Sequence, residues 1–440
     1  MKGPRSPGPR NSFTGPRSSD PRGRPTRPPE PAAAPARPAA PLVQLPARRP
    51  GSLPAVTLMR PWADAIREGR PWVFTDAVQM PSGLAAGDVA DLVDTSGAFI
   101  ARGMVEPESP LAFRVWTTDE TVAVDERLLR RRLESAAESR AASVGSNVTG
   151  FRLCHGEGDG IPGLQCDLYG TIASLRTDGR LGVAWERRFV DAVKAVAKPT
   201  AIVVRNPHVE DSAARVVFGK VAGEVVISEG DRRFWVDVLA GQKTGFFLDQ
   251  RENRDRIGKM SRGRDVLNLF GYTGGFSVAA ALGGARRVVT VDIAKPAVET
   301  ARRNFELNGL DPAGHGFVAA DAFDVLASAV QTPGEFDLIV VDPPSFAPNQ
   351  KSLDRALRAY GKLAELAFKA VRPGGFVASA SCSSHVRMDA FLDLLAKAAV
   401  SACVDTTVLT VAGAGPDHPT RLGFPEGSYL KFVLTHVRPR

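Results

Sequence analysis

Cysteine is scarce in this sequence, and the shortage excludes two common small-domain architectures. The 440 residues hold four cysteines, and no two of them form a CxxC pair: Cys154, Cys166, Cys382 and Cys403. A disulfide framework needs regularly spaced pairs, and a structural zinc site needs four clustered Cys or His ligands. The sequence therefore predicts neither a disulfide scaffold nor a metal site.

Long apolar runs are also missing. No stretch of about 18 or more apolar residues occurs, so no membrane span is expected. The first residues are rich in Pro and Arg and lack the apolar segment of a secretory signal. We therefore expect a cytoplasmic protein that has no membrane partner.

Net charge is absent from most of the chain. Residues 1–50 hold ten Lys or Arg against two acidic residues, which accounts for the whole net charge of +8, and they hold 14 of the 34 prolines. Such a segment cannot bury enough apolar surface to offset the entropy lost on ordering, so residues 1–54 are predicted to be a disordered tail. The tail is either solubilising or a basic arm that contacts RNA phosphates, and its dispersed arginines favour the first interpretation.

Three folded segments are predicted after the tail. Residues 55–120 show short strands and turns typical of a small β-barrel, and residues 121–228 mix helices and strands in an α+β arrangement. Residues 229–440 alternate strands and helices, which predicts an α/β domain with an open parallel sheet. In this segment strands are predicted at 265–270, 288–291, 316–319, 337–341 and 376–380, and helices at 296–308 and 353–371.

Residues able to do chemistry follow these predicted strands. Gly271, Asp292, Asp321, Asp342 and Cys382 each come at or just beyond a strand end. In open parallel sheets ligands bind outside the carboxyl ends of the strands. We therefore expect the five residues to share one site.

A glycine turn, GYTGG at 271–275, is the first element of that site. Gly271 and Gly274 let backbone approach a ligand, and the following helix N-terminus favours a carboxylate. Asp292 can accept hydrogen bonds from both ribose hydroxyls of a nucleoside. The chain has neither GxGxxG here nor GxxxxGK[ST]. The glycines alone leave dinucleotide binding open, but together with Asp292 and Asp321 they favour a ligand without pyrophosphate, such as S-adenosylmethionine.

The second element is Asp342 with the two prolines that follow it. Pro343 and Pro344 stiffen the loop and fix the carboxylate at the strand end. A fixed carboxylate can accept from the amino group of a flipped base or share a proton with its ring nitrogen, and Phe346 could stack on that base. The same pattern serves methyl transfer to exocyclic amines, so it does not decide which atom is methylated.

Cys382 is the third element. A lone cysteine is usually a small buried hydrophobic residue. A thiolate at this strand end could instead attack C6 of a pyrimidine and make C5 nucleophilic, which methylation of an amine does not require. Position alone leaves both interpretations open. The thiolate form requires a lowered pKa, for which His385 is one candidate partner, although His385 could equally form only local hydrogen bonds.

Several longer motifs resemble those of the bacterial large-subunit ribosomal RNA cytosine-5 methyltransferases. They are GQKTGFFLDQRENR at 241–254, NLFGYTGGF at 268–276, DPPSF at 342–346, SCS at 381–383, DHP at 417–419 and PEGSYLK at 425–431. Upstream, PWVF at 71–74, GDV at 87–89 and RG at 102–103 resemble the PUA domain of that family. The similarity runs from about residue 56 to the end of the chain.

The resemblance implies an N-terminal PUA β-barrel that binds RNA, a central α+β domain and a class I, Rossmann-like methyltransferase domain. It implies S-adenosylmethionine as cofactor, 23S ribosomal RNA as partner and 5-methylcytosine as product. The implied catalytic pair is Cys382 and Asp342. The implied cofactor residues are Gln250, Phe270, Gly271, Tyr272, Gly274, Asp292 and Asp321. The residues expected to contact the substrate are Pro343, Pro344, Phe346 and His418.

Two alternatives remain at this stage. A relative with similar motifs makes 7-methylguanine and lacks the cysteine, so a purine N-methyltransferase is the nearest alternative, and a non-catalytic RNA-binding assembly factor is the other. Many other RNA cytosine-5 methyltransferases carry a second cysteine where this chain has Ser345, so the base that removes the C5 proton is unassigned. The sequence does not decide between a monomer and a homodimer.

Overall fold

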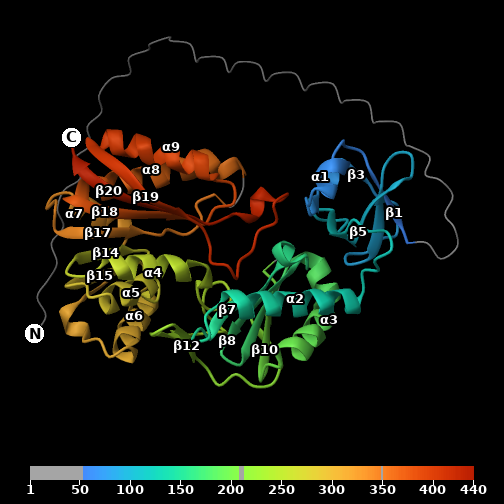
Figure 1. Cartoon of the computed structure of the whole chain (residues 1–440), viewed down its shortest axis with the longest axis horizontal. Helices are drawn as coiled ribbons and strands as arrows, with labels where there is room; N and C mark the ends of the chain where they lie inside the picture. Colours follow the sequence, from blue (N-terminus) through green and yellow to red (C-terminus); the bar gives the residue numbers. More distant parts are fainter. Residues whose placement is uncertain (1–52, 208–212, 348–349) are drawn as a thin grey trace, which may run out of the picture. The chain divides into compact units, whose positions relative to one another are not determined.

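The computed structural model describes residues 53–207, 213–347 and 350–440, and its elements run in order along the chain (Figure 1). The predicted tail lies outside these residues except for its last two positions. Among the described residues, no helix is both long enough and apolar enough for a membrane span.

The first sheet contains six short strands. They pair in the order β2-β6-β5-β4-β1-β3 and enclose an apolar core that includes Val56, Leu92 and Phe113. Their bounds are β1 (Ala55–Leu58), β2 (Trp72–Val73), β3 (Val78–Gln79), β4 (Val89–Val93), β5 (Phe99–Val105) and β6 (Phe113–Thr117), with the short helix α1 (Ala63–Arg67) after β1. This is the predicted N-terminal β domain.

The second sheet has five strands, and two helices pack against it. The strands pair in the order β11-β10-β9-β8-β7, and α2 and α3 cover one face. Helix α2 begins after Asp125, whose side chain accepts a hydrogen bond from the backbone N–H of Leu128 and so caps the helix. The elements are α2 (Glu126–Ser143), β7 (Gly150–His155), β8 (Leu164–Tyr169), β9 (Ile172–Thr177), α3 (Gly179–Ala197), β10 (Ala201–Arg205) and β11 (Arg215–Phe218).

A hairpin of β12 (Val225–Glu229) and β13 (Arg232–Val236) leads to the third, seven-stranded sheet. Its strand order is β16-β15-β14-β17-β18-β20-β19, parallel as far as β18 and antiparallel beyond. The strands are β14 (Asp265–Leu269), β15 (Arg287–Asp292), β16 (Gly316–Ala319), β17 (Phe336–Val341), β18 (Val371–Ser381), β19 (Val404–Ala412) and β20 (Lys431–Pro439).

Helices cover both faces of this sheet because its central strands are apolar on both sides. Leu267 and Leu269 of β14 pack with one group of helices, and Val266 packs with the other. The first group is α7 (Ala322–Ala329), α8 (Leu353–Ala370) and α9 (Met388–Ser401), and the second is α4 (Arg251–Met260), α5 (Gly275–Leu282) and α6 (Lys295–Leu307) (Figure 1). The predicted class I methyltransferase fold is confirmed.

Candidate active site

The turn after β14 approaches its neighbours so closely that two of its positions require glycine. A Cβ atom on Gly271 would lie 2.7 Å from Cγ2 of Thr290, and one on Gly274 would lie 2.9 Å from Cβ of Ala301. Gly274 also has a φ of +80° directly before α5. The two glycines thus let the turn settle tightly against β15 and α6.

Asp292 ties this turn to the end of β15. Its Oδ2 accepts a hydrogen bond from the backbone N–H of Tyr272 at 2.8 Å, and its Oδ1 accepts one from Ala294 at 2.9 Å. Phe270 and Tyr272 have φ values of 56° and 47°, which are unfavourable for residues with a Cβ atom. The carboxylate therefore holds a strained turn, and each of its oxygens keeps a lone pair for a further donor.

A cavity of about 540 Å³ opens where β14, β15, β17 and β18 end, a size typical of a small-molecule site. Eleven of the thirteen predicted site residues line it. They are Gln250, Phe270, Gly271, Tyr272, Asp292, Asp321, Asp342, Pro343, Pro344, Phe346 and Cys382. The structure therefore brings the glycine turn and the four strand-end side chains into one cavity.

The other two predicted residues lie outside the cavity lining. Gly274 shapes the turn against α6, as described above. His418 is buried, with its Nδ1 3.2 Å from Oδ1 of Asp417 and its ring centroid 5.0 Å from that of His155 in β7. Asp417 forms a 2.8 Å ion pair with Arg251. His418 therefore belongs to the contact between the second and third sheets rather than to the cavity.

The cavity suits a nucleoside ligand. Asp321 caps α7 by accepting a hydrogen bond from the N–H of Phe323 at 2.7 Å, and its carboxylate is exposed. Asp292 and Asp321 supply acceptors for hydroxyl or amino donors. Ile293 and Phe323 contribute apolar surface to the cavity wall. These residues fit the ribose and base of the predicted cofactor.

Asp342 follows β17, and its carboxyl group has an unusually high pKa. Gln250 donates a hydrogen bond from Nε2 to Oδ1 of Asp342 at 3.0 Å, and Asn253 fixes that amide by donating to its Oε1 at 2.6 Å. Burial, together with the negative charge of Asp249, raises the pKa of Asp342 to about 7. Near neutral pH this carboxyl group can therefore both take up and give up a proton.

Cys382 follows β18, the strand that pairs with β17. Burial raises the pKa of its thiol to about 11, and the charges of Asp342 and Asp249 act in the same direction. The ammonium groups of Lys243 and Lys431 oppose this shift. The pKa of the thiol is therefore raised, whereas a thiolate nucleophile requires a lowered one, because burial outweighs the two lysines.

His385 is not placed to lower the pKa of the Cys382 thiol. Its side chain is exposed, and it is not among the residues that line the cavity. Lys431 is a buried cation close to Cys382, held by hydrogen bonds from Nζ to the backbone oxygens of Ser383 and Tyr429. Burial lowers the pKa of Lys431 to about 8.

The sequence interpretation missed a charged group formed by Lys243, Asp249 and Tyr429. Oδ2 of Asp249 lies 2.7 Å from Nζ of Lys243 and accepts a hydrogen bond from the Tyr429 hydroxyl at 2.6 Å. Burial opposes ionisation of Asp249, but the Lys243 ammonium and these hydrogen bonds hold its pKa well below the usual range. All three residues lie inside motifs that the sequence analysis quoted, yet nothing in the motifs shows that they meet.

Phe346 lies half-buried at the cavity wall, 4.9 Å from the ring of Tyr360. Ser345 also lines the cavity, and its hydroxyl is 2.8 Å from that of Ser383. The loop after Asp342 is therefore attached to the segment that carries Cys382.

Comparisons with known proteins agree with the fold described above. A family model described as S-adenosylmethionine-dependent methyltransferase matches residues 181–410, and one described as PUA-like domain matches residues 56–118. A ribosomal RNA large subunit methyltransferase of Deinococcus radiodurans is 38% identical over 84% of this chain and 94% of its own length. A ribosomal RNA large subunit methyltransferase I of Aeromonas hydrophila is 36% identical over 84% of this chain and 95% of its own length.

Solved structures show the same fold at lower sequence identity. A Streptococcus mutans protein assigned to the SAM-dependent methyltransferases superposes with a TM-score of 0.78 at 22% identity, covering 87% of this chain and 100% of its own. A second methyltransferase structure, solved with SAH, superposes with a TM-score of 0.76 at 22% identity. It covers 87% of this chain and 99% of its own.

Proposed function

The chain belongs to the family of S-adenosylmethionine-dependent large-subunit ribosomal RNA methyltransferases, and we propose that it forms 5-methylcytosine in 23S ribosomal RNA through a covalent bond to Cys382. The observation that carries this proposal is the position of Cys382 and Asp342 in one cavity, at the ends of two paired strands. Methylation of an exocyclic amine or a purine nitrogen would give the cysteine no chemical task.

We assign the cofactor to the part of the cavity formed by Asp292, Asp321 and the glycine turn. When bound, S-adenosylmethionine supplies an electrophilic methyl group. Asp292 would accept hydrogen bonds from the ribose hydroxyls, because its oxygens retain lone pairs beyond those used by the backbone. Asp342 and Cys382 remain for the base.

Replacement of Asp292 by alanine should weaken cofactor binding by about 30- to 1,000-fold, because two charge-assisted hydrogen bonds of about 1–2 kcal/mol each are lost. Calorimetric titration with S-adenosylmethionine measures this. Asp324→Ala is the matched control, since Asp324 is an exposed acid in the first turn of α7 and does not line the cavity. Equal affinities for the two variants would remove Asp292 from the cofactor site.

The reaction that we propose begins with a proton transfer within the cavity. The thiol of Cys382 gives its proton to the ionised form of Asp342, and this leaves a thiolate beside a neutral carboxyl group. The Lys243 and Lys431 ammonium groups stabilise the thiolate, since both act to lower the pKa of Cys382. The raised pKa of Asp342 makes this transfer less costly than it would be for an ordinary carboxylate.

The thiolate then attacks cytosine C6. A bond forms between Sγ and C6, the ring electrons shift so that a C4=C5 double bond develops, and N3 takes the proton from Asp342. C5 is now nucleophilic and accepts the methyl group. Loss of the C5 proton to a base re-forms the C5=C6 bond, breaks the Sγ–C6 bond and returns the N3 proton.

Nucleoside mass analysis of 23S ribosomal RNA, with and without this protein, tests the proposed product. We expect one 5-methylcytidine to disappear when the protein is removed. Loss of a methylated purine instead would favour the N-methyltransferase alternative, and an unchanged nucleoside inventory would favour the non-catalytic assembly factor.

A further inference from the structure

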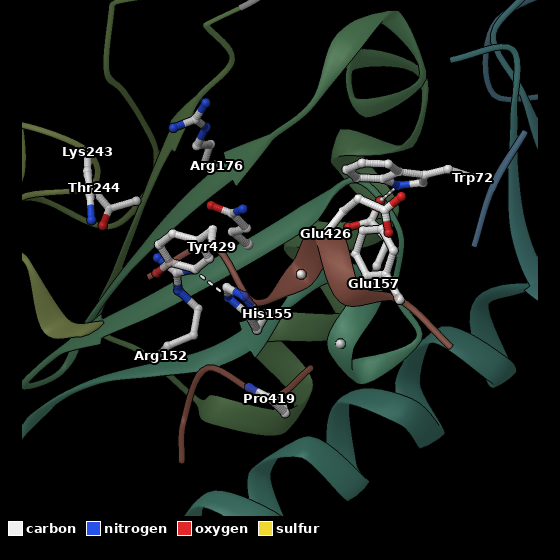
Figure 2. A pocket seen from close by; sticks show the side chains of 14 residues that line it. Trp72, Arg152, His155, Glu157, Arg176, Lys243, Thr244, Pro419, Glu426 and Tyr429 are labelled. Carbon is white, nitrogen blue, oxygen red and sulfur yellow. Dashed lines mark hydrogen bonds between the residues drawn. The ribbon is translucent and has the colours of Figure 1, made fainter. Parts of the chain in front are cut away.

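A second cavity, of about 250 Å³, lies outside the active site (Figure 2). Its walls come from three parts of the described chain: Trp72 of β2, polar residues of β7 to β9, and the connection between β19 and β20. In Figure 2 Arg176 and Lys243 lie toward one end, and Trp72, Glu157 and Glu426 lie toward the other. No residue that the sequence analysis assigned to the site lines this cavity.

The cavity floor is a polar row on the central sheet. Strand pairing places His155 opposite Gln165, and Gln165 opposite Arg176. Neighbouring Cys166 and Leu175 are buried in the core against α2 and α3. The sheet thus has a helix-covered apolar face, and the row lies where that core does not cover it.

Arg176 is the cation of this cavity for which no described carboxylate lies within ion-pair distance. Arg152 forms a 2.5 Å ion pair with Asp167, and Lys243 is paired with Asp249. Within the described residues, the Arg176 guanidinium makes neither a hydrogen bond nor an ion pair, although it is half-buried. Burial lowers its pKa, and the more distant charges of Asp178 and Asp167 oppose that shift. A partly desolvated cation without a partner provides a binding group for an anion such as a phosphate.

Trp72 provides a fixed aromatic surface at the other end. Its indole N–H donates a hydrogen bond to Oε1 of Glu157 at 2.9 Å, and its ring meets that of Phe424 edge-on at 4.5 Å. The ring itself stays half-buried. A rigid tryptophan at one end of a cavity and an arginine at the other can hold the base and the phosphate of one unstacked nucleotide.

Only a thin wall separates this cavity from the active site. Lys243 lines both cavities, and Tyr429 of the second cavity hydrogen-bonds to Asp249 of the first. An RNA strand that places its target base beside Cys382 can therefore extend to the second cavity. Its volume is below the range of about 300–1,000 Å³ for drug-sized ligands, which suits one nucleotide rather than a longer segment.

We propose that the second cavity binds the unpaired nucleotide adjacent to the methylated cytosine, with Arg176 on its phosphate and Trp72 against its base. The proposal rests on the proposed function, because it takes the strand that the active site modifies as its ligand. It assigns substrate positioning to the junction of the PUA-like domain and the central sheet.

Steady-state kinetics on a short RNA containing the target site test the role of Arg176. Arg176→Ala should raise the KM for RNA about ten-fold and leave kcat and S-adenosylmethionine affinity within two-fold, because one charge-assisted phosphate contact is lost. Arg187→Ala is the charge-matched control, since Arg187 of α3 is 95% exposed and does not line the cavity. Equal KM values for the two variants would overturn the proposal.

An abasic substrate tests the role of Trp72. Trp72→Leu should lower kcat/KM about ten-fold on intact RNA, since base stacking on an aromatic side chain contributes about 1–3 kcal/mol. On RNA that lacks the base on one side of the target, the same substitution should cost less than about two-fold. A full ten-fold loss on both abasic RNAs, one lacking the base before the target and one lacking the base after it, would show that Trp72 acts only through the protein structure and would contradict the proposal.

Product analysis in the same assays separates this proposal from the proposed function. If the methylated nucleoside is not 5-methylcytidine, the cytosine mechanism fails whatever the KM values are. If 5-methylcytidine forms and neither Arg176 nor Trp72 affects the use of RNA, the second cavity fails as a nucleotide site and the mechanism stands.

Discussion

Replacing Cys382 by alanine should abolish methylation and leave cofactor binding unchanged. The thiolate is the only group in the mechanism that adds to C6, and without the addition C5 has too little electron density to attack a sulfonium methyl group. Loss of a covalent nucleophile lowers turnover by at least roughly 10⁴-fold. Single-turnover assays with labelled S-adenosylmethionine measure the loss.

Cys403→Ala is the matched control for this variant. Cys403 is an exposed cysteine of the same domain and lies outside the cavity, so its replacement should leave turnover unchanged. Near wild-type turnover in Cys382→Ala would show that the cysteine is incidental. The purine N-methyltransferase alternative would then become the better explanation.

Replacing Asp342 by asparagine should lower turnover by about 10²- to 10⁴-fold, the usual contribution of a positioned general acid or base. The amide can still accept the hydrogen bond from Gln250, which preserves the local geometry. It can neither take the proton of Cys382 nor deliver one to N3. Retained cofactor affinity with lost turnover is the expected pattern, and unchanged turnover would contradict the proton-transfer role.

The same substitution should stabilise the protein at alkaline pH. Because the pKa of Asp342 rises from 3.8 to about 7 on folding, the folded protein holds a proton that the unfolded chain has lost between about pH 4 and pH 7. The free energy of unfolding of the wild type therefore falls as pH rises through this window. Asp342→Asn removes that loss, so the variant should be about 4 kcal/mol more stable than wild type at pH 8 and nearly equal to it at pH 4. Melting temperatures at the two pH values measure the difference.

The position of the active site could be predicted because it depends on strand ends. Asp292, Asp321, Asp342 and Cys382 follow apolar segments that are recognisable as strands, and the carboxyl ends of parallel strands meet at one edge. The predicted strand at 316–319 coincides with β16, and the predicted helix at 353–371 differs from α8 by one residue.

The charges that tune the site could not be predicted in the same way. Lys243 and Asp249 belong to one motif, but Tyr429 is 180 residues from Asp249 and reaches it only through tertiary packing. Whether the pKa of Cys382 is raised or lowered depends on the balance between burial and nearby charges of both signs, and a motif does not contain that information. Strand β7 was not predicted either, so neither Arg152 nor the polar row beside it was identified.

Trapping with RNA that carries 5-fluorocytidine at the target position tests the central claim most directly. Fluorine cannot leave C5 as a proton does, so the enzyme should remain covalently attached to the methylated RNA. We predict a complex that survives denaturation, requires S-adenosylmethionine, maps by peptide mass analysis to Cys382 and is missing in Cys382→Ala. Methylation of the unfluorinated RNA without any trapped complex, or a complex that maps to another residue, would contradict the mechanism.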